Sequence, residues 1–202
     1  SRWCCRWPTH PAQSSGRHDV ADGLFYNDIR EPFVTVAPGA VTLTSAAKAL
    51  YTASQFPVLG GHYFSRVGKK LKIRLFGVMT TAATPGNGSF NVYYGTGADA
   101  NGVALITGTP VALTANQTAF AWMLEIVVTC ITTGSAGTLR ANGFAMHNEA
   151  TLAPHQMLPT GSSAASAACD LTAALIISVQ YLRSGSTVET MQVLDMEVTA
   201  LN

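Results

Sequence analysis

The chain has 202 residues, of which 11% are charged and 48% are hydrophobic, and its formal net charge is +1. Ordinary soluble domains carry about 25% charged residues, so a chain this poor in charge is expected to bury much of its surface against other copies or other subunits. The small net charge gives no field that attracts nucleic acid or an anionic membrane. No apolar stretch reaches the roughly 18 residues of a membrane-spanning helix. We therefore expect a structural building block of one domain, with no direct contact to nucleic acid and no membrane segment.

Residues 1–36 differ in composition from the rest of the chain. They hold two of the three tryptophans and three of the nine prolines, and residues 1–18 contain three arginines and no acid. Disordered tails contain few aromatic residues, so this segment is too apolar for a purely solvated tail. We predict an extended N-terminal arm, residues 1–36, that becomes ordered on a neighbouring subunit. Its expected anchors are the aromatic residues Trp3, Trp7, Phe25, Tyr26 and Phe33.

From residue 34 onward apolar and polar residues alternate with a period of two, which predicts β-strands. Only residues 45–53 have a helix-like, alanine-rich composition, and so many strands outweigh it. Strands are expected at 70–80, 90–94, 103–106, 111–114, 120–130, 138–146, 171–182 and 187–201, with glycine-rich turns between several of them. The alternation predicts a core formed by Phe120, Trp122, Leu124, Ile126 and Val128, with Leu71, Ile73 and Leu75 nearby.

Eight or more strands, some longer than ten residues, favour a two-sheet antiparallel sandwich of the jelly-roll-like form over an immunoglobulin-like one. We therefore predict an all-β fold, with residues 37–202 as the sandwich domain.

Catalytic and cofactor signatures are missing from the sequence. It contains no G-x-S-x-G nucleophile elbow, no P-loop and no H-E-x-x-H zinc motif, and its five histidines lack the close spacing of zinc ligands. Asp195 and Glu197 share one face of the last strand, but catalytic carboxylates usually come from separate elements across a cleft. A rim of salt bridges is the preferred interpretation of that pair. We expect no enzymatic activity, no cofactor and no bound metal.

The strongest polar feature lies at residues 66–74, which hold five of the twelve basic residues. Alternation places Lys70, Lys72 and Arg74 on one outward stripe, which continues into Phe76 and Val78. Such a stripe can simply keep a strand soluble and discourage edge pairing. Basic and then apolar residues on an outer face are also typical of an interface with a polar rim that contacts an anionic surface. We predict that the five residues of this stripe, Lys70 to Val78, form a contact between subunits.

The order of turn and strand motifs resembles that of small β-sandwich structural proteins of tailed bacteriophages, of the capsid decoration (cement) or minor structural kind. The resemblance covers roughly residues 40–202. It is carried by AAKAL at 46–50, GHYF at 61–64, GKKLKI at 68–73, GVMTT at 77–81, FNVYYG at 90–95, WMLE at 122–125, GSAGT at 134–138 and EVTALN at 197–202. The resemblance implies a jelly-roll-like fold, oligomers on the virion surface and no enzymatic activity.

These expectations together describe a capsid decoration protein of the virion, assembled in the host cytoplasm. It would form a homo-oligomer, with a trimer as the first expectation, and bind the major capsid protein or other virion subunits. A phage tail or fibre component is the alternative within virions. A carbohydrate-binding β-sandwich module is the alternative of another class. That module would need exposed aromatics, and the candidates are Tyr63, Tyr93 and Tyr94, because Trp122 fits the core.

Overall fold

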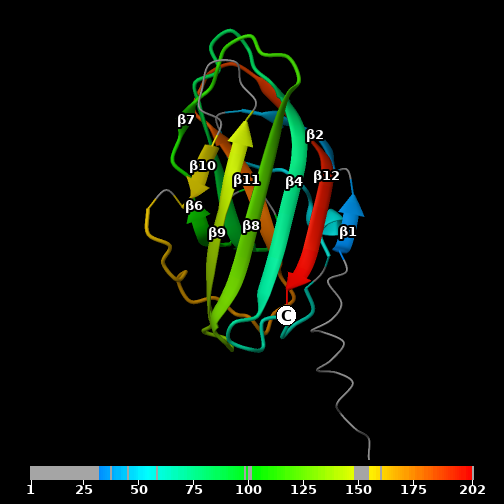
Figure 1. The fold of residues 1–202 in the computed structure, drawn as a ribbon, viewed down its shortest axis with the longest axis vertical. Coiled ribbons are helices and arrows are strands. Elements are labelled where there is room, and N and C mark those ends of the chain that lie inside the picture. Colours follow the sequence, from blue (N-terminus) through cyan, green and yellow to red (C-terminus); the bar gives the residue numbers. More distant parts are fainter. Residues whose placement is uncertain are drawn as a thin grey trace, which may run out of the picture.

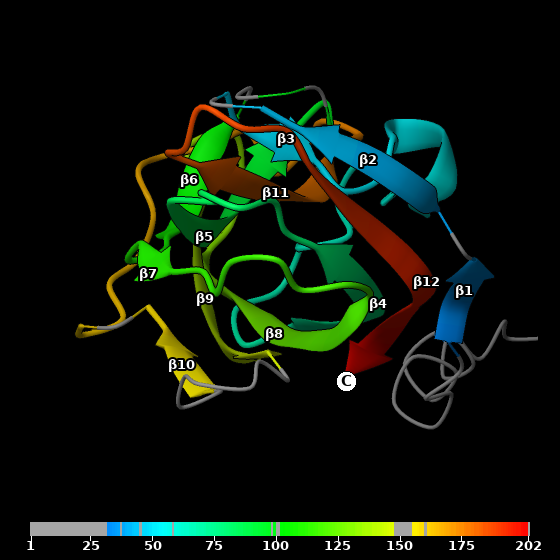
Figure 2. The same cartoon turned by 90° about the horizontal axis from the view of Figure 1, so that it is seen from above.

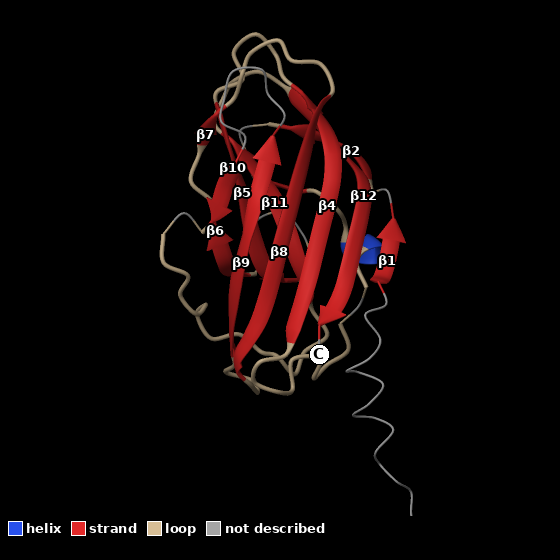
Figure 3. Cartoon of the chain, in the orientation of Figure 1, coloured by secondary structure: helices blue, strands red, loops and turns tan. Residues whose placement is uncertain are grey.

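The described part of the computed structural model comprises residues 32–36, 38–44, 46–57, 59–97, 99, 102–147, 155–159 and 161–201. It consists almost entirely of β-strands in two antiparallel sheets that pack face to face (Figure 1 and Figure 3). The all-β sandwich predicted from the alternation is confirmed. The expected arm anchors Trp3, Trp7, Phe25 and Tyr26 lie outside the described residues, so their docking stays a prediction.

We name the two layers sheet A and sheet B. Among the described residues, sheet A has the order β1-β12-β4-β8-β9-β10, with β2 also paired to β12, and sheet B has the order β3-β11-β5-β6, with β7 also paired to β5. The strands of sheet A are β1 (Pro32–Val36), β2 (Gly39–Leu43), β4 (Lys70–Thr80), β8 (Phe120–Thr132), β9 (Thr138–His147), β10 (His155–Leu158) and β12 (Glu189–Leu201). Those of sheet B are β3 (Lys48–Ala49), β5 (Asn87–Gly95), β6 (Val103–Thr107), β7 (Val111–Ala112) and β11 (Ile176–Arg183).

The connectivity is that of a jelly roll. Within sheet A the neighbours run β2-β12-β4-β8, and within sheet B they run β3-β11-β5-β6. Apart from the β5–β6 hairpin, successive strands of these eight cross from one sheet to the other, which is how an eight-strand jelly roll pairs its two Greek keys. Strands β1, β9 and β10 extend sheet A beyond this set. Seen from above, the two sheets enclose the core between them (Figure 2).

The alternating pattern places the core as predicted. Strand β4 alternates buried and outward residues along its whole length, and its inward residues Leu71, Ile73 and Leu75 are fully buried. They pair in register with the inward residues of β8, which brings Leu71 opposite Val128 and Leu75 opposite Leu124. The other predicted members of the β8 stripe are also buried: Phe120, Trp122 and Ile126.

Gly77 shows why the register around Trp122 requires a residue without a side chain. The two residues are partners across β4 and β8, and a Cβ atom at Gly77 would overlap both the Trp122 ring and the backbone carbonyl oxygen of Gln192. The absence of a side chain at one position therefore makes room for the largest side chain at the other. The Trp122 ring in turn packs against Phe90 of the opposite sheet, with ring centroids 5.6 Å apart.

Residues 45–53 agree with the expectation that strands outweigh their alanine-rich composition, whereas residues 32–36 differ from the sequence-based expectation. Residues 45–53 do not form an α-helix in their described part; they contain β3 and lead into a 3₁₀ turn, η1 (Ala53–Gln55). Thr52 caps this turn, and its backbone N–H donates to Gln55 Oε1 at 2.8 Å. Residues 32–36, expected as the last part of the arm, instead form β1 and pair with β12 of the same chain. Local composition does not show that a segment will pair with the free edge of a long strand, here β12.

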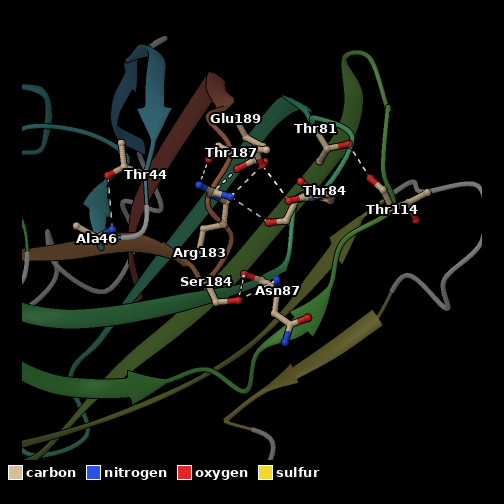
Figure 4. A network of polar contacts seen from close by, with 11 residues as sticks. Thr44, Ala46, Thr81, Thr84, Asn87, Thr114, Arg183, Ser184, Thr187 and Glu189 are labelled. Atoms are coloured by element: carbon tan, nitrogen blue, oxygen red, sulfur yellow. Dashed lines mark hydrogen bonds and ion pairs between the residues drawn. The ribbon is translucent and has the colours of Figure 1, made fainter.

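A buried ion pair ties together one end of the sandwich. Arg183 and Glu189 end β11 and begin β12, their side chains are 1% and 0% exposed, and they form an ion pair. Arg183 also donates from Nη1 to the carbonyl oxygen of Pro85 at 3.1 Å, and from Nη2 to the carbonyl oxygen of Thr187 (Figure 4). Because charged groups are costly to bury without partners, this pair stays buried only as long as both members and their hydrogen bonds remain.

The loops at that same end are linked by threonine hydroxyl groups. Thr187 donates to the carbonyl oxygen of Thr84 at 2.9 Å, and Thr81 donates to the carbonyl oxygen of Thr114 at 2.6 Å (Figure 4). These bonds connect the β11–β12, β4–β5 and β7–β8 loops. The end of the sandwich is therefore a set of mutually fastened loops rather than independent hairpin tips.

Candidate functional site

The outer face of sheet A carries the residues that the sequence singled out on β4. The burial pattern of the strand confirms that the predicted stripe points away from the core. Lys70 and Phe76 are exposed, and Lys72, Arg74 and Val78 are half-buried. The fifth aromatic anchor, Phe33, lies in β1, where the structure describes only the backbone. The role of these residues as a contact between subunits stays a prediction.

Two of the three basic residues of the β4 stripe form ion pairs within the chain. Arg74 donates to Glu125 Oε2 of β8 from Nε at 3.0 Å and from Nη2 at 2.8 Å, and its Nη1 lies 3.8 Å from Glu197 Oε2 of β12. Lys72 Nζ lies 4.0 Å from Glu197 Oε1. The hydrogen bond to Glu125 raises the pKa of the Arg74 guanidinium. Lys72, Arg74, Glu125 and Glu197 thus form a neutral network, and Lys70 at the start of the same stripe is exposed outside it.

The expected rim of salt bridges at Asp195 and Glu197 is therefore half confirmed. Glu197 joins the Arg74–Lys72 network and also accepts a hydrogen bond from the Thr199 hydroxyl at 2.8 Å. Asp195 is exposed and lies opposite Phe76 in the register of β12 and β4. No second carboxylate faces it across a cleft, as far as the described residues show.

An apolar patch lies beside this network on the outer face of sheet A. Phe76 is 38% exposed and pairs with Met123 of β8, which in turn pairs with Met146 of β9. Leu194 of β12, the strand next to β4, is 48% exposed, and Met157 of β10, at the margin of the sheet, is 70% exposed. The apolar patch is made up of Phe76, Val78, Met123, Phe144, Met146, Met157 and Leu194. An apolar centre bordered by paired charges is the composition of a protein–protein interface.

The outer face of sheet B is closed by the chain itself. On β11 the outward residues Ser178 and Gln180 are fully buried, although they point away from the core. The β5–β6 loop lies over this strand: Gly97 sits directly on the Ile176 side chain. Sheet A and sheet B thus differ, because one outer face is open and the other is covered.

An ion pair fixes the β5–β6 loop to the edge of sheet B. Asp99 accepts from Lys48 Nζ at 2.8 Å and from the backbone N–H of Ala49 at 2.7 Å. Although burial opposes ionisation, the hydrogen bonds from Ala49 and Lys48 together hold the pKa of Asp99 below its usual value. The loop therefore crosses β11 and ends on β3, which keeps the outer face of sheet B closed.

The tyrosines proposed for sugar binding do not form one platform. Tyr94 is buried and its hydroxyl donates to the carbonyl oxygen of Ala173 at 3.3 Å. Tyr93 follows the opposite face of the same strand, so the two rings point away from each other. Tyr63 lies in the loop before β4, with Lys69 Nζ 4.5 Å from its ring centroid. Trp122 is 3% exposed, which confirms its expected place in the core.

The remaining candidate chemistry is buried. Cys130 and Cys169 are buried free thiols, and burial raises the pKa of each. A buried protonated thiol is a poor nucleophile and a poor metal ligand. Within the described residues no three His, Cys, Asp or Glu side chains lie together as metal ligands would. The same residues contain no helix of the length and apolar character needed to cross a membrane.

Comparisons with known proteins give little beyond the fold. No protein-family model matches the sequence, and no curated protein matches it either. Among solved structures, a glycoside hydrolase engineered for endo-xylanase and exo-arabinofuranosidase activity matches with a TM-score of 0.34 and 8% identity, over 66% of this chain and 29% of that one. This chain thus spans less than a third of that enzyme.

Two further structures are similar at the same low level. An alginate lyase mutant in complex with an alginate trisaccharide has a TM-score of 0.33 and 9% identity, over 83% of this chain and 88% of that one. The binding domain of botulinum neurotoxin DC in complex with rat synaptotagmin II has a TM-score of 0.30 and 7% identity, over 86% of this chain and 44% of that one. These scores are too low to indicate an activity or a ligand.

Proposed function

We propose that this protein is a non-enzymatic structural protein of a phage virion, a capsid decoration protein that oligomerises on the head and stabilises the shell through subunit contacts. One observation carries the proposal: within the described residues, the outer face of sheet A has exposed apolar residues at its centre, whereas the outward residues Ser178 and Gln180 of sheet B are buried. A protein that closes one face of its sandwich and leaves the other apolar has a surface suited to a partner. The jelly-roll topology and the low charge content support the same role.

The apolar patch is the surface that we assign to contacts between subunits. Phe76, Leu194 and Met157 account for most of the exposed apolar area on this face. The methionines in the patch adapt their shape to a partner more readily than branched side chains do. Arg74 beside the patch is paired within the chain, whereas Asp195, opposite Phe76, is exposed and would need a basic or polar group of the partner on burial. Its work in a shell is mechanical: buried apolar area resists the outward pressure of the packaged genome.

The location of the protein in a virus particle tests the proposed function directly. We expect gold-labelled antibodies raised against this chain to bind the heads of purified particles, at regular positions over the shell. Labels on the tail or fibres would favour the alternative within virions. Particles that carry no label, from a culture in which the protein is produced, would refute the structural role altogether.

A matched pair of variants tests the apolar patch. Phe76→Asp introduces a charge at the centre of the patch, and Val67→Asp makes the same kind of change at a residue that is 64% exposed in the loop before β4. We expect light scattering to show an oligomer, with a trimer as the first expectation, for the wild type and for Val67→Asp, and a smaller species for Phe76→Asp. A wild type that is a monomer at micromolar concentration, or equal masses for all three proteins, would contradict the assignment.

A further inference from the structure

Strands β1 and β2 lie along the same edge of β12 as two parts of one strand. Val36, the last residue of β1, pairs with Met196, and Gly39, the first residue of β2, pairs with Val193. Two residues lie between the two positions on each strand, so the register of β1 continues into that of β2. The interruption faces the point on β12 where the pairing with β4 shifts, between Val193 and Asp195. Only this short link divides β1 from the jelly roll.

The link at residues 37–38 separates β2, which has several contacts, from β1, which pairs with one strand. Pro38 has no N–H to give to the ladder, and its carbonyl oxygen accepts from Gln55 Nε2 at 3.1 Å. From Pro38 onward the chain is thus held by η1, and β2 also lies close to β3 and β11. Within the described residues, β1 pairs with β12 alone. A rotation at residues 37–38 would release β1 without disturbing any other strand.

We propose that β1 is exchanged between copies of this chain: β1 of one copy pairs with residues 196–199 of β12 in a second copy, in the register seen here within one chain. This inference rests on the proposed function, in which copies of the chain are held side by side, and it names a second copy as the subunit that the N-terminal arm was expected to reach. Exchange replaces each backbone hydrogen bond by an identical one, so it needs no new complementary surface.

Concentration and the link together decide between the two arrangements. The intrachain and interchain ladders are chemically the same, and the difference in free energy lies in the link and in the loss of free motion on association. Once copies are held side by side through another contact, the effective concentration of a neighbouring β12 reaches the millimolar range. In the assembled oligomer, exchange therefore costs no further loss of free motion on association, and the strain in the link decides between the two arrangements.

A crosslink between register partners distinguishes exchange from pairing within one chain. Thr35 of β1 faces Glu197 of β12, and register partners on facing strands have Cβ atoms about 4.5–5.5 Å apart, which a short bis-maleimide reagent spans. The double variant Thr35→Cys/Glu197→Cys is made with Cys4→Ser and Cys5→Ser, and is treated at high concentration. Each single variant in the same background is the control. A denaturing gel and peptide mapping then show whether residues 35 and 197 are joined between chains or within one chain.

The expected result is a ladder of covalent dimers and larger species, with the 35–197 peptide link, for the double variant alone. A monomer with an internal 35–197 link would overturn the exchange, and so would a double variant without any such link, because β1 would then not pair with β12 in solution. The outcome is independent of particle labelling. Labelled heads with an internal link would support the proposed function and refute the exchange. Unlabelled particles with interchain links would refute the proposed function and support the exchange.

Discussion

Removing Glu189 should destabilise the sandwich more than any change to its surface charges. The Glu189→Leu variant leaves the Arg183 guanidinium, 1% exposed, without its carboxylate. Breaking a buried ion pair at one partner costs about 3–5 kcal/mol, because the remaining charge has no water to solvate it. For a domain of this size, about 1 kcal/mol corresponds to roughly 2–4 °C, so the melting temperature should fall by about 6–20 °C. Urea and thermal unfolding, followed by circular dichroism, measure both quantities.

The double variant isolates the pair from its surroundings. We expect Arg183→Met/Glu189→Leu to be less destabilised than the sum of the two single variants, because it removes both buried charges together. Lys48→Met is the matched control, since it breaks an ion pair whose side chains are 36% and 44% exposed, and it should cost about 0–1 kcal/mol. If Glu189→Leu were no more destabilising than Lys48→Met, the reasoning from burial would be wrong.

Three further outcomes follow from the fold. Gly77→Ala should unfold at much lower urea concentration than the wild type, while Gly161→Ala, where nothing lies within 4 Å of a new Cβ atom, should behave as the wild type; similar midpoints would contradict the packing at β4. Burial raises the pKa of Tyr94 to about 12, against about 10 in the unfolded chain. The contribution of the neutral Tyr94 to the free energy of unfolding is therefore fully present below about pH 10 and is lost as the pH rises towards 12. In Tyr94→Phe, this loss of stability should be smaller. In a Cys4→Ser/Cys5→Ser background, Cys130 and Cys169 should react with a thiol reagent only after unfolding, and rapid labelling of the native protein would show that they are not buried.

The sequence predicts the long strands well because their alternation is uninterrupted. The expected strand at 70–80 coincides with β4, and that at 120–130 falls within β8. The short strands β1 and β10 were not expected, because four or five residues carry too little periodicity to stand out. Residues 45–53 agree with the expectation that their alanine-rich composition is outweighed: β3 gains its stability from pairing with β11, which lies far away in the sequence.

The candidate site was predictable in its outline and not in its electrostatics. Alternation alone places Arg74 and Phe76 on the outer face of β4. It cannot show that Glu125 and Glu197 lie beside Arg74, because that depends on the register between three strands. Nor can it show that outward residues of β11 are covered, since the cover is a loop that crosses from another part of the chain.

The position of β12 in sheet A determines the order in which the protein can be completed during its synthesis. This strand, Glu189–Leu201, is the direct neighbour of β1, β2 and β4, so β1 and β2 lack their strand partner, and β4 lacks one of its two, until the late part of the chain has been made. Until residue 201 has left the ribosome, the edges of β2 and β4 and the buried Arg183 are exposed. Contacts of such long sequence separation make folding slow and leave partly folded chains prone to aggregation. A chain that stops before β12 should therefore be a substrate for chaperones and proteases, so that only complete subunits become available for assembly.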